Sequence, residues 1–127
     1  MKLRIKGPSL RLRLTQGEVH ALATAGRIEE RVPFGAGSEL IYRLQRDAAA
    51  TQISAALQGA VIEIRVPEQL ANAWCTSEQV TLAQAQPVAG GALQITLEKD
   101  FACLAPRADE DESDNYPHPE AASGKSC

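Results

Sequence analysis

Alternating leucines mark the stretch Ser9-Leu10-Arg11-Leu12-Arg13-Leu14, which leads directly into a helix-start signal. The same alternation of apolar with polar or charged residues recurs in Val61-Ile62-Glu63-Ile64-Arg65-Val66, and a similar signal follows it. Further along the chain, Leu40–Asp47 is echoed by Leu93–Asp100. Repetition of this kind indicates that one structural unit occurs twice.

Both copies read as a strand, a helix and two further strands. A period of two predicts the strands, because successive side chains of a strand point to opposite faces. In the first copy, Thr15 and Glu18 match a capping box at the predicted helix start, and Gly26 supplies a stop. In the second copy, Pro67 suits the first helical turn, since proline lacks a backbone donor.

These elements predict an α+β fold with two helices. Short reversals between the strands favour antiparallel pairing, so we expect a mostly antiparallel sheet or a partial barrel built from the duplicated strand–helix–strand–strand unit. An added strand lies at the start, and another follows the first copy. We expect one globular domain at residues 1–104, with internal repeats at about 9–58 and 61–104. Residues 105–127 lose the apolar pattern and are expected to form an acidic, proline-containing tail.

Composition favours a cytoplasmic protein. The 127 residues contain no apolar run long enough to cross a bilayer and no continuous apolar segment typical of a signal peptide. The three cysteines are widely spaced and form no CxxC motif, which fits a reducing compartment better than a disulfide framework. We therefore expect a cytoplasmic location and no membrane association.

Charge is distributed unevenly along the chain. Residues 1–14 carry five basic side chains and no acid. Residues 105–127 carry six acids against Arg107 and Lys125, a net charge of −4, whereas the whole chain has a net charge of −3. The residues before the tail are therefore close to neutral, which argues against a nucleic-acid binder. A basic start and an acidic end favour attraction between the two, or of each to a partner.

Arginines at alternate strand positions form the best candidate site. If their strands lie in one sheet, several guanidinium groups converge on a surface suited to phosphate or carboxylate, and thus to an anionic ligand or a protein partner. The alternative is the ordinary solvated outer face of a sheet. The candidate ligand-binding residues are Arg4, Arg11, Arg13, Arg43 and Arg65.

The sequence contains no familiar catalytic, metal or cofactor motif. Residues 109–120 space their acids like a calcium loop, but Asp114 stands where that loop needs glycine. Cys103, His118 and Cys127 do not supply the four ligands of a structural zinc site. We therefore expect no catalytic residues, no metal and no cofactor.

The tail contains a candidate docking segment, Tyr116-Pro117-His118-Pro119. Prolines reduce the entropy lost on binding, and the tyrosine supplies an anchor. This segment is expected to dock on the protein's own arginines, on a second subunit or on another protein. The alternative is a spacer without a partner.

Four segments together carry a resemblance to known proteins: Lys2–Gly7, Ser9–Thr15, Leu97–Leu104 and Asp114–Pro119. With these segments the chain resembles a family of small, uncharacterised bacterial proteins. The resemblance spans almost the whole chain and implies a bacterial source and a tail that belongs to the protein. The family has no assigned activity, so no functional residue carries over.

The duplicated unit with charged alternate strand positions is also similar in outline to the CYTH-type triphosphate tunnel enzymes. Those enzymes line a barrel with Arg, Lys and Glu, which hold triphosphate and metal. Their opening run of alternating glutamates is missing here, because Leu3, Arg4 and Ile5 fill the comparable strand. This departure weakens the case for a metal site and for catalysis.

Three functions follow from the sequence. The first is a small binding or accessory protein with an arginine-rich face and an acidic docking tail. The second is an enzyme of the CYTH type that acts on phosphorylated or polyphosphate substrates. The third is a homo-oligomer, a structural protein that associates with itself through an open sheet edge.

Overall fold

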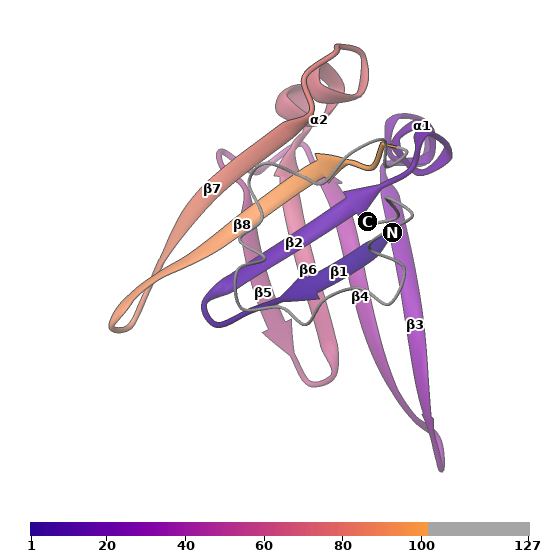
Figure 1. Ribbon diagram of the computed structural model, residues 1–127, viewed down its shortest axis with the longest axis vertical. Coiled ribbons are helices and arrows are strands. Elements are labelled where there is room, and N and C mark those ends of the chain that lie inside the picture. Colours follow the sequence, from indigo (N-terminus) through magenta and orange to yellow (C-terminus); the bar gives the residue numbers. More distant parts are fainter. Residues whose placement is uncertain (102–127) are drawn as a thin grey trace, which may run out of the picture.

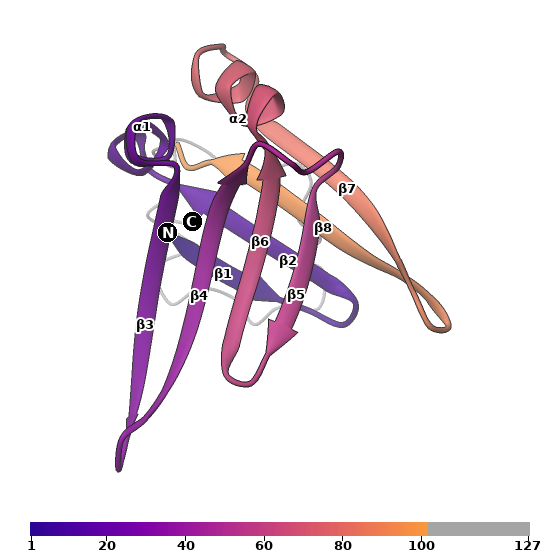
Figure 2. The ribbon, with the colours of Figure 1, turned by 180° about the vertical axis from the view of Figure 1, so that it is seen from behind.

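The computed structural model describes residues 1–101 of the chain. Within them, eight strands form two sheets and two helices lie at one end (Figures 1 and 2). The elements are β1 (Lys2–Ile5), β2 (Ser9–Leu14), α1 (Gln16–Ala25), β3 (Arg27–Gly35), β4 (Ser38–Asp47), β5 (Ser54–Gln58), β6 (Val61–Pro67), α2 (Glu68–Cys75), β7 (Thr81–Val88) and β8 (Gly91–Lys99).

Each sheet contains one hairpin from each half of the chain. The first sheet has the strand order β1-β2-β8-β7, and the second has the order β3-β4-β6-β5. In both sheets the two central strands run parallel, β2 with β8 and β4 with β6, while the outer pairs are antiparallel. The α+β prediction is confirmed, and the matching order of the two sheets fits a duplicated unit. The sheets are mixed and do not close into a barrel.

Pairing also defines the structural unit. Strand β5 pairs with β6 as β1 pairs with β2, so the strand at Ser54–Gln58 groups with the second half of the fold. The unit seen in the structure is therefore a hairpin, a helix and a second hairpin. The two units interlock, because each gives one hairpin to each sheet.

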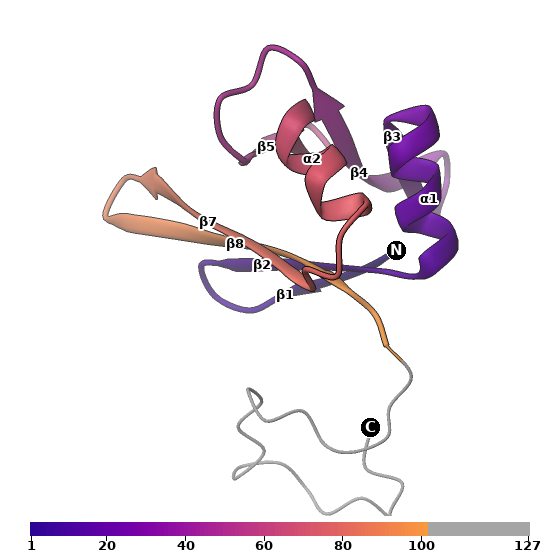
Figure 3. The ribbon, with the colours of Figure 1, turned by 90° about the horizontal axis from the view of Figure 1, so that it is seen from above.

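The core lies between the two sheets and beneath the helices, which cover one end of the space between them (Figure 3). Its centre is formed by corresponding pairs on the parallel strands, Leu12 beside Leu97 and Leu44 beside Ile64, all at most 1% exposed. Trp74 of α2 is fully buried, and its indole N–H donates to the carbonyl of Val80 at 3.1 Å. The apolar alternation read from the sequence thus points into one shared core.

The helix ends explain why the elements stop where they do. Thr15 and Glu18 form the predicted capping box of α1, and Gly26 ends the helix with a φ of 76°, a left-handed conformation that glycine adopts without steric cost. Basic residues of two strand ends bind carbonyls at the end of α1 and two residues beyond the end of α2. Arg46 donates to the carbonyl of Ala23 at 2.8 Å, and Lys99 donates to that of Ser77 at 2.7 Å.

Side chains join the edges of the two sheets. The amide of Gln86 on β7 accepts from the backbone of Ala55 on β5 at 2.7 Å and donates back to it at 2.9 Å. On the other side of the molecule, the hydroxyl of Tyr42 on the inner strand β4 donates to the carbonyl of Met1, just before β1, at 2.9 Å. These contacts tie the sheets together without a continuous backbone ladder. In the described part of the chain, neither helix is long and apolar enough to cross a membrane.

The two central positions should be equally sensitive to truncation. Leu44→Ala and Leu97→Ala each remove a fully buried side chain, so each should lower the free energy of unfolding by about 2–5 kcal/mol. Leu57→Ala, at a side chain that is 69% exposed, should cost less than about 0.5 kcal/mol. Urea denaturation of the three variants measures these differences, and a small effect at either central leucine would contradict the shared core.

Candidate functional site

The outer side of the first sheet carries four cations, and we call this surface the basic face. It consists of Lys2 and Arg4 on β1 and Arg11 and Arg13 on β2. Lys2 lies directly opposite Arg13, and Arg4 lies opposite Arg11, so the four side chains share one side of the sheet. The leucines between them, such as Leu12, point into the core. Like charges placed directly opposite one another destabilise a sheet unless an anion lies near them.

Two carboxylates of this sheet lie among the cations. Glu98 is only 5% exposed and accepts from the Arg13 Nε at 2.6 Å, with Arg11 at 3.8 Å. Asp100, just beyond the end of β8, pairs with Lys2 at 3.1 Å. Among residues 1–101, the basic face therefore has four cations and two carboxylates.

The outer side of the second sheet is balanced instead. Its central arginine, Arg43, pairs with Glu29 at 2.8 Å and with Glu63 at 3.6 Å. Arg65 pairs with Asp47 at 2.9 Å and with Glu63 at 3.3 Å. Further pairs join Arg27 and Arg31 to Glu29, and Arg31 to Glu39, so four cations alternate with four carboxylates in an ion-pair network.

The five predicted arginines therefore lie on two surfaces. The structure brings Arg4, Arg11 and Arg13 together on the first sheet, whereas Arg43 and Arg65 lie on the second. Arg43 and Arg65 border a depression of about 290 Å³ with Glu63 between them. The predicted docking segment Tyr116–Pro119 and the rest of the tail lie outside the described residues.

Charge pairing shifts several pKa values in the ion-pair network. The Arg43 guanidinium, which hydrogen-bonds to Glu29, holds the pKa of that carboxyl below its ordinary value of 4.5, and Arg31 acts in the same direction. A hydrogen bond from the backbone of Ala49, together with Arg65, lowers the pKa of Asp47. These carboxylates are therefore ionised at neutral pH and stabilise the second sheet.

Lys2 and Asp100 were absent from the predicted site, although both belong to the basic face. Lys2 and Arg4 are two residues apart in one strand, so the sequence alone places them on the same side of it. The sequence gives no sign, however, that Asp100 lies close to β1. No group of three or more metal-ligating side chains occurs within residues 1–101. In that same part of the chain, every buried side-chain nitrogen or oxygen has a hydrogen-bond partner.

Comparison with known proteins assigns the chain to a family. Residues 1–120 match the profile of DUF7009, a family of unknown function. The chain belongs to this family. The sequence-based expectation of a family without an assigned activity is thereby confirmed. No curated protein and no solved structure matches the chain. For a member of DUF7009, function has to be argued from the surfaces themselves.

The lowered pKa of Glu29 predicts how stability depends on pH. A carboxyl whose pKa is lower in the folded state contributes stability above its unfolded pKa, and this contribution disappears as the pH falls through the folded pKa. At neutral pH, Glu29→Gln should therefore melt at a lower temperature than the wild type. The gap should narrow as the pH falls below the ordinary carboxyl pKa of 4.5 and through the lower folded pKa of Glu29. Melting curves from neutral to acidic pH test the idea, with the exposed Glu78→Gln as control, and a gap that does not narrow as the pH falls would contradict it.

Proposed function

We propose that this protein is a binding protein whose basic face holds an acidic polypeptide segment. The observation that carries the proposal is the cross-strand placement of Lys2, Arg4, Arg11 and Arg13 on one side of the sheet, where residues 1–101 also place two carboxylates, Glu98 and Asp100. Extended acidic peptides present carboxylates at intervals that such rows of cations match, and arginine binds carboxylates with two parallel hydrogen bonds.

The choice between the two arginine surfaces rests on charge balance. On the second sheet, each of the four arginines already has a carboxylate partner within 4 Å, and cations and acids are equal in number. An incoming anion would have to displace those carboxylates. Within residues 1–101, the basic face instead has more cations than carboxylates, and this difference in charge favours an added anion there.

The acidic tail is proposed as an occupant of the same face. The run Asp109–Asp114 carries five acids, and it follows Phe101 by only a few residues. Seven extended residues span up to about 25 Å, whereas the step from β8 across β2 to β1 is about 10 Å. The tail can therefore reach the basic face within the same molecule. Tyr116, between this run and Pro117, supplies an aromatic anchor for docking.

Features of the interior favour a binding protein over an enzyme of the CYTH type. Such an enzyme needs Arg, Lys and Glu around a tunnel. Between the two sheets, the described residues instead place Leu12, Leu44, Ile64 and Leu97, each at most 1% exposed. The cations of the basic face therefore lie on the outer surface of the protein, where a polypeptide can bind them without entering a tunnel.

A charge-reversal experiment tests the basic face. The probe is a fluorescein-labelled peptide with the sequence of residues 105–120, titrated into the full chain and followed by fluorescence anisotropy. Lys2→Glu/Arg4→Glu should weaken binding by about tenfold or more, because two attractive charges become repulsive. Raised salt should weaken binding to the wild type as well.

The matched control is Arg27→Glu/Arg31→Glu, which makes the same change of charge on the second sheet. Its affinity for the peptide should stay within about twofold of the wild type, because net charge acts weakly beyond a Debye length. Equal loss in both variants would mean that only net charge matters. Equal binding of a DNA duplex would mean a general polyanion surface, and either result would contradict the proposal.

Neutralising the tail tests whether it occupies the face. Replacing the five acids of Asp109–Asp114 by the corresponding amides should increase the affinity of the full chain for the labelled peptide. A tethered segment competes at an effective concentration in the millimolar range, so its removal should raise apparent affinity severalfold. An unchanged affinity would show that the tail does not compete. Tyr116→Ala in the labelled peptide should weaken its binding if the tyrosine is the anchor.

A further inference from the structure

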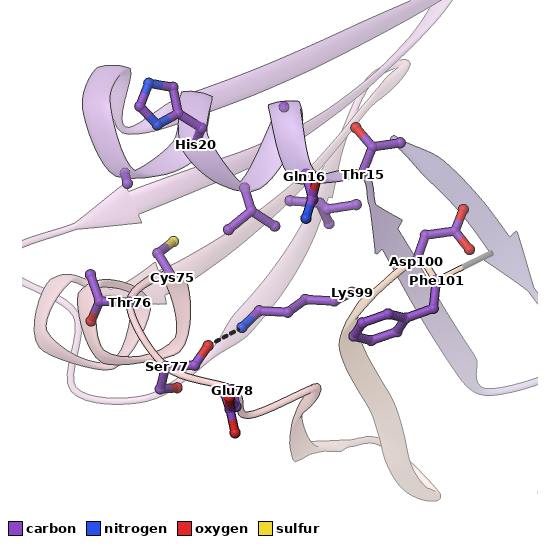
Figure 4. Close-up of a pocket in the computed structure, with 14 residues that line it drawn as sticks. Thr15, Gln16, His20, Cys75, Thr76, Ser77, Glu78, Lys99, Asp100 and Phe101 are labelled. Carbon is purple, nitrogen blue, oxygen red and sulfur yellow. Dashed lines mark hydrogen bonds between the residues drawn. The ribbon is translucent and has the colours of Figure 1, made fainter.

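A groove between the two helices forms a second candidate site, separate from the basic face (Figure 4). It lies between the N-terminal half of α1 and the C-terminal end of α2, above the ends of β2 and β8, and has a volume of about 1060 Å³. None of the four cations of the basic face lines it. Pockets of this size accept small molecules.

The groove has apolar walls. Leu14 and Val19 are buried at its base, and Ala23 of α1 lies along its side. Phe101 stands at its rim with 58% of its surface exposed. A large aromatic side chain that is exposed beside a groove gains free energy when an apolar group covers it.

A single ammonium group crosses the groove. Lys99 extends from the end of β8 toward α2, and its Nζ donates to the carbonyl of Ser77 at 2.7 Å (Figure 4). The same Nζ lies 5.4 Å from the centre of the Trp74 ring, which fixes its position over the buried indole. An ammonium has three donors, and within the described residues Ser77 takes one of them.

Lys99 shares the groove with two carboxylates, Glu78 and Asp100, and is the one lysine or arginine among its lining residues. Asp100 is held by Lys2 at 3.1 Å, on the side of the basic face. Burial raises the pKa of the Cys75 thiol, and the nearby charges of Lys99 and Arg46 offset part of that rise. Two independent features, apolar walls and a fixed cation, therefore meet in one groove.

We propose that the helix groove binds a small amphiphilic carboxylate. The carboxylate accepts hydrogen bonds from Lys99, and the apolar chain of the ligand lies along Val19 and Ala23 toward Phe101. Gln16, whose amide points into the groove in Figure 4, is placed to donate a second hydrogen bond to the carboxylate. This site is independent of the basic face, and it stands if the proposed peptide binding fails.

The molecule contains its own reporter for this site. Trp74 is the only tryptophan of the chain and lies directly beneath the Lys99 ammonium. An anion bound to Lys99 changes the field at the indole and therefore its fluorescence. The signal arises at the site itself and not from elsewhere in the protein.

The test titrates the full chain with octanoate and follows both Trp74 fluorescence and the heat of binding by calorimetry. Octanol is the matched probe without charge, and acetate is the matched probe without an apolar chain. Octanoate should bind saturably, and both controls should bind at least about tenfold more weakly, which corresponds to 1.4 kcal/mol. No saturable binding of octanoate, or equal binding of octanol, would overturn the proposal.

Two variants separate the charge from the space. Lys99→Met should weaken octanoate binding by at least about tenfold but leave octanol unchanged. Ala23→Phe keeps Lys99 and fills the groove, so it should abolish binding of octanoate, whereas Ala25→Phe, outside the groove on the same helix, should not. Thermal melting checks that each variant folds. If Lys99→Met does not fold, the comparison of Ala23→Phe with Ala25→Phe still tests the proposal. Equal octanoate binding by these two variants would overturn it.

Discussion

The parallel pairing of strands from opposite halves of the chain is the constraint on which the fold depends. The central pair of the first sheet is β2 with β8, and that of the second sheet is β4 with β6. Neither sheet can form until these strands have paired. Leu12 and Leu97 meet only through this pairing, and so do Leu44 and Ile64. Neither half can therefore bury its own apolar residues alone. The ion pair of Arg13 with Glu98 joins residues 85 positions apart, a non-local contact of the kind that slows folding.

The same pairing determines what the two outer surfaces can do. Corresponding strands of the two halves carry different charges, Arg11 on β2 against Glu63 on β6. Arg11 adds a positive charge to the outer side of the first sheet. Glu63, at the corresponding position of the second sheet, pairs with Arg43 and Arg65. The two halves thus share the arrangement of their strands and the inward leucine and isoleucine positions, while their outward positions differ in charge.

Much of the local structure could be predicted from the sequence, because local signals determine it. The capping box at Thr15, the stop at Gly26 and the alternation around Leu12 each depend on a few neighbouring residues. Strand partners could not be predicted, because alternation looks the same in parallel and antiparallel neighbours and in either sheet. For that reason Arg43 was grouped with Arg11, although they lie on different sheets.

The helix groove was beyond prediction for a related reason. Its lining comes from the ends of β2 and β8, from α1 and from the end of α2, segments that are far apart along the chain. In the sequence, Lys99 looks like one more cation on the surface of a strand. Its position in the groove depends on its contacts with Ser77 and Trp74, which the sequence does not show. Only the arrangement of the helices shows that its ammonium lies over Trp74.

The ion pair between Lys2 and Asp100 has a consequence for the chain as a whole. It joins the first strand to the residue that follows the last strand of the described part of the chain. Within residues 1–101, the order of the strands along the chain could therefore change while each strand keeps its neighbours. A short bridge between these two positions and a new opening between β4 and β5 would give a circularly permuted chain with the same neighbours throughout.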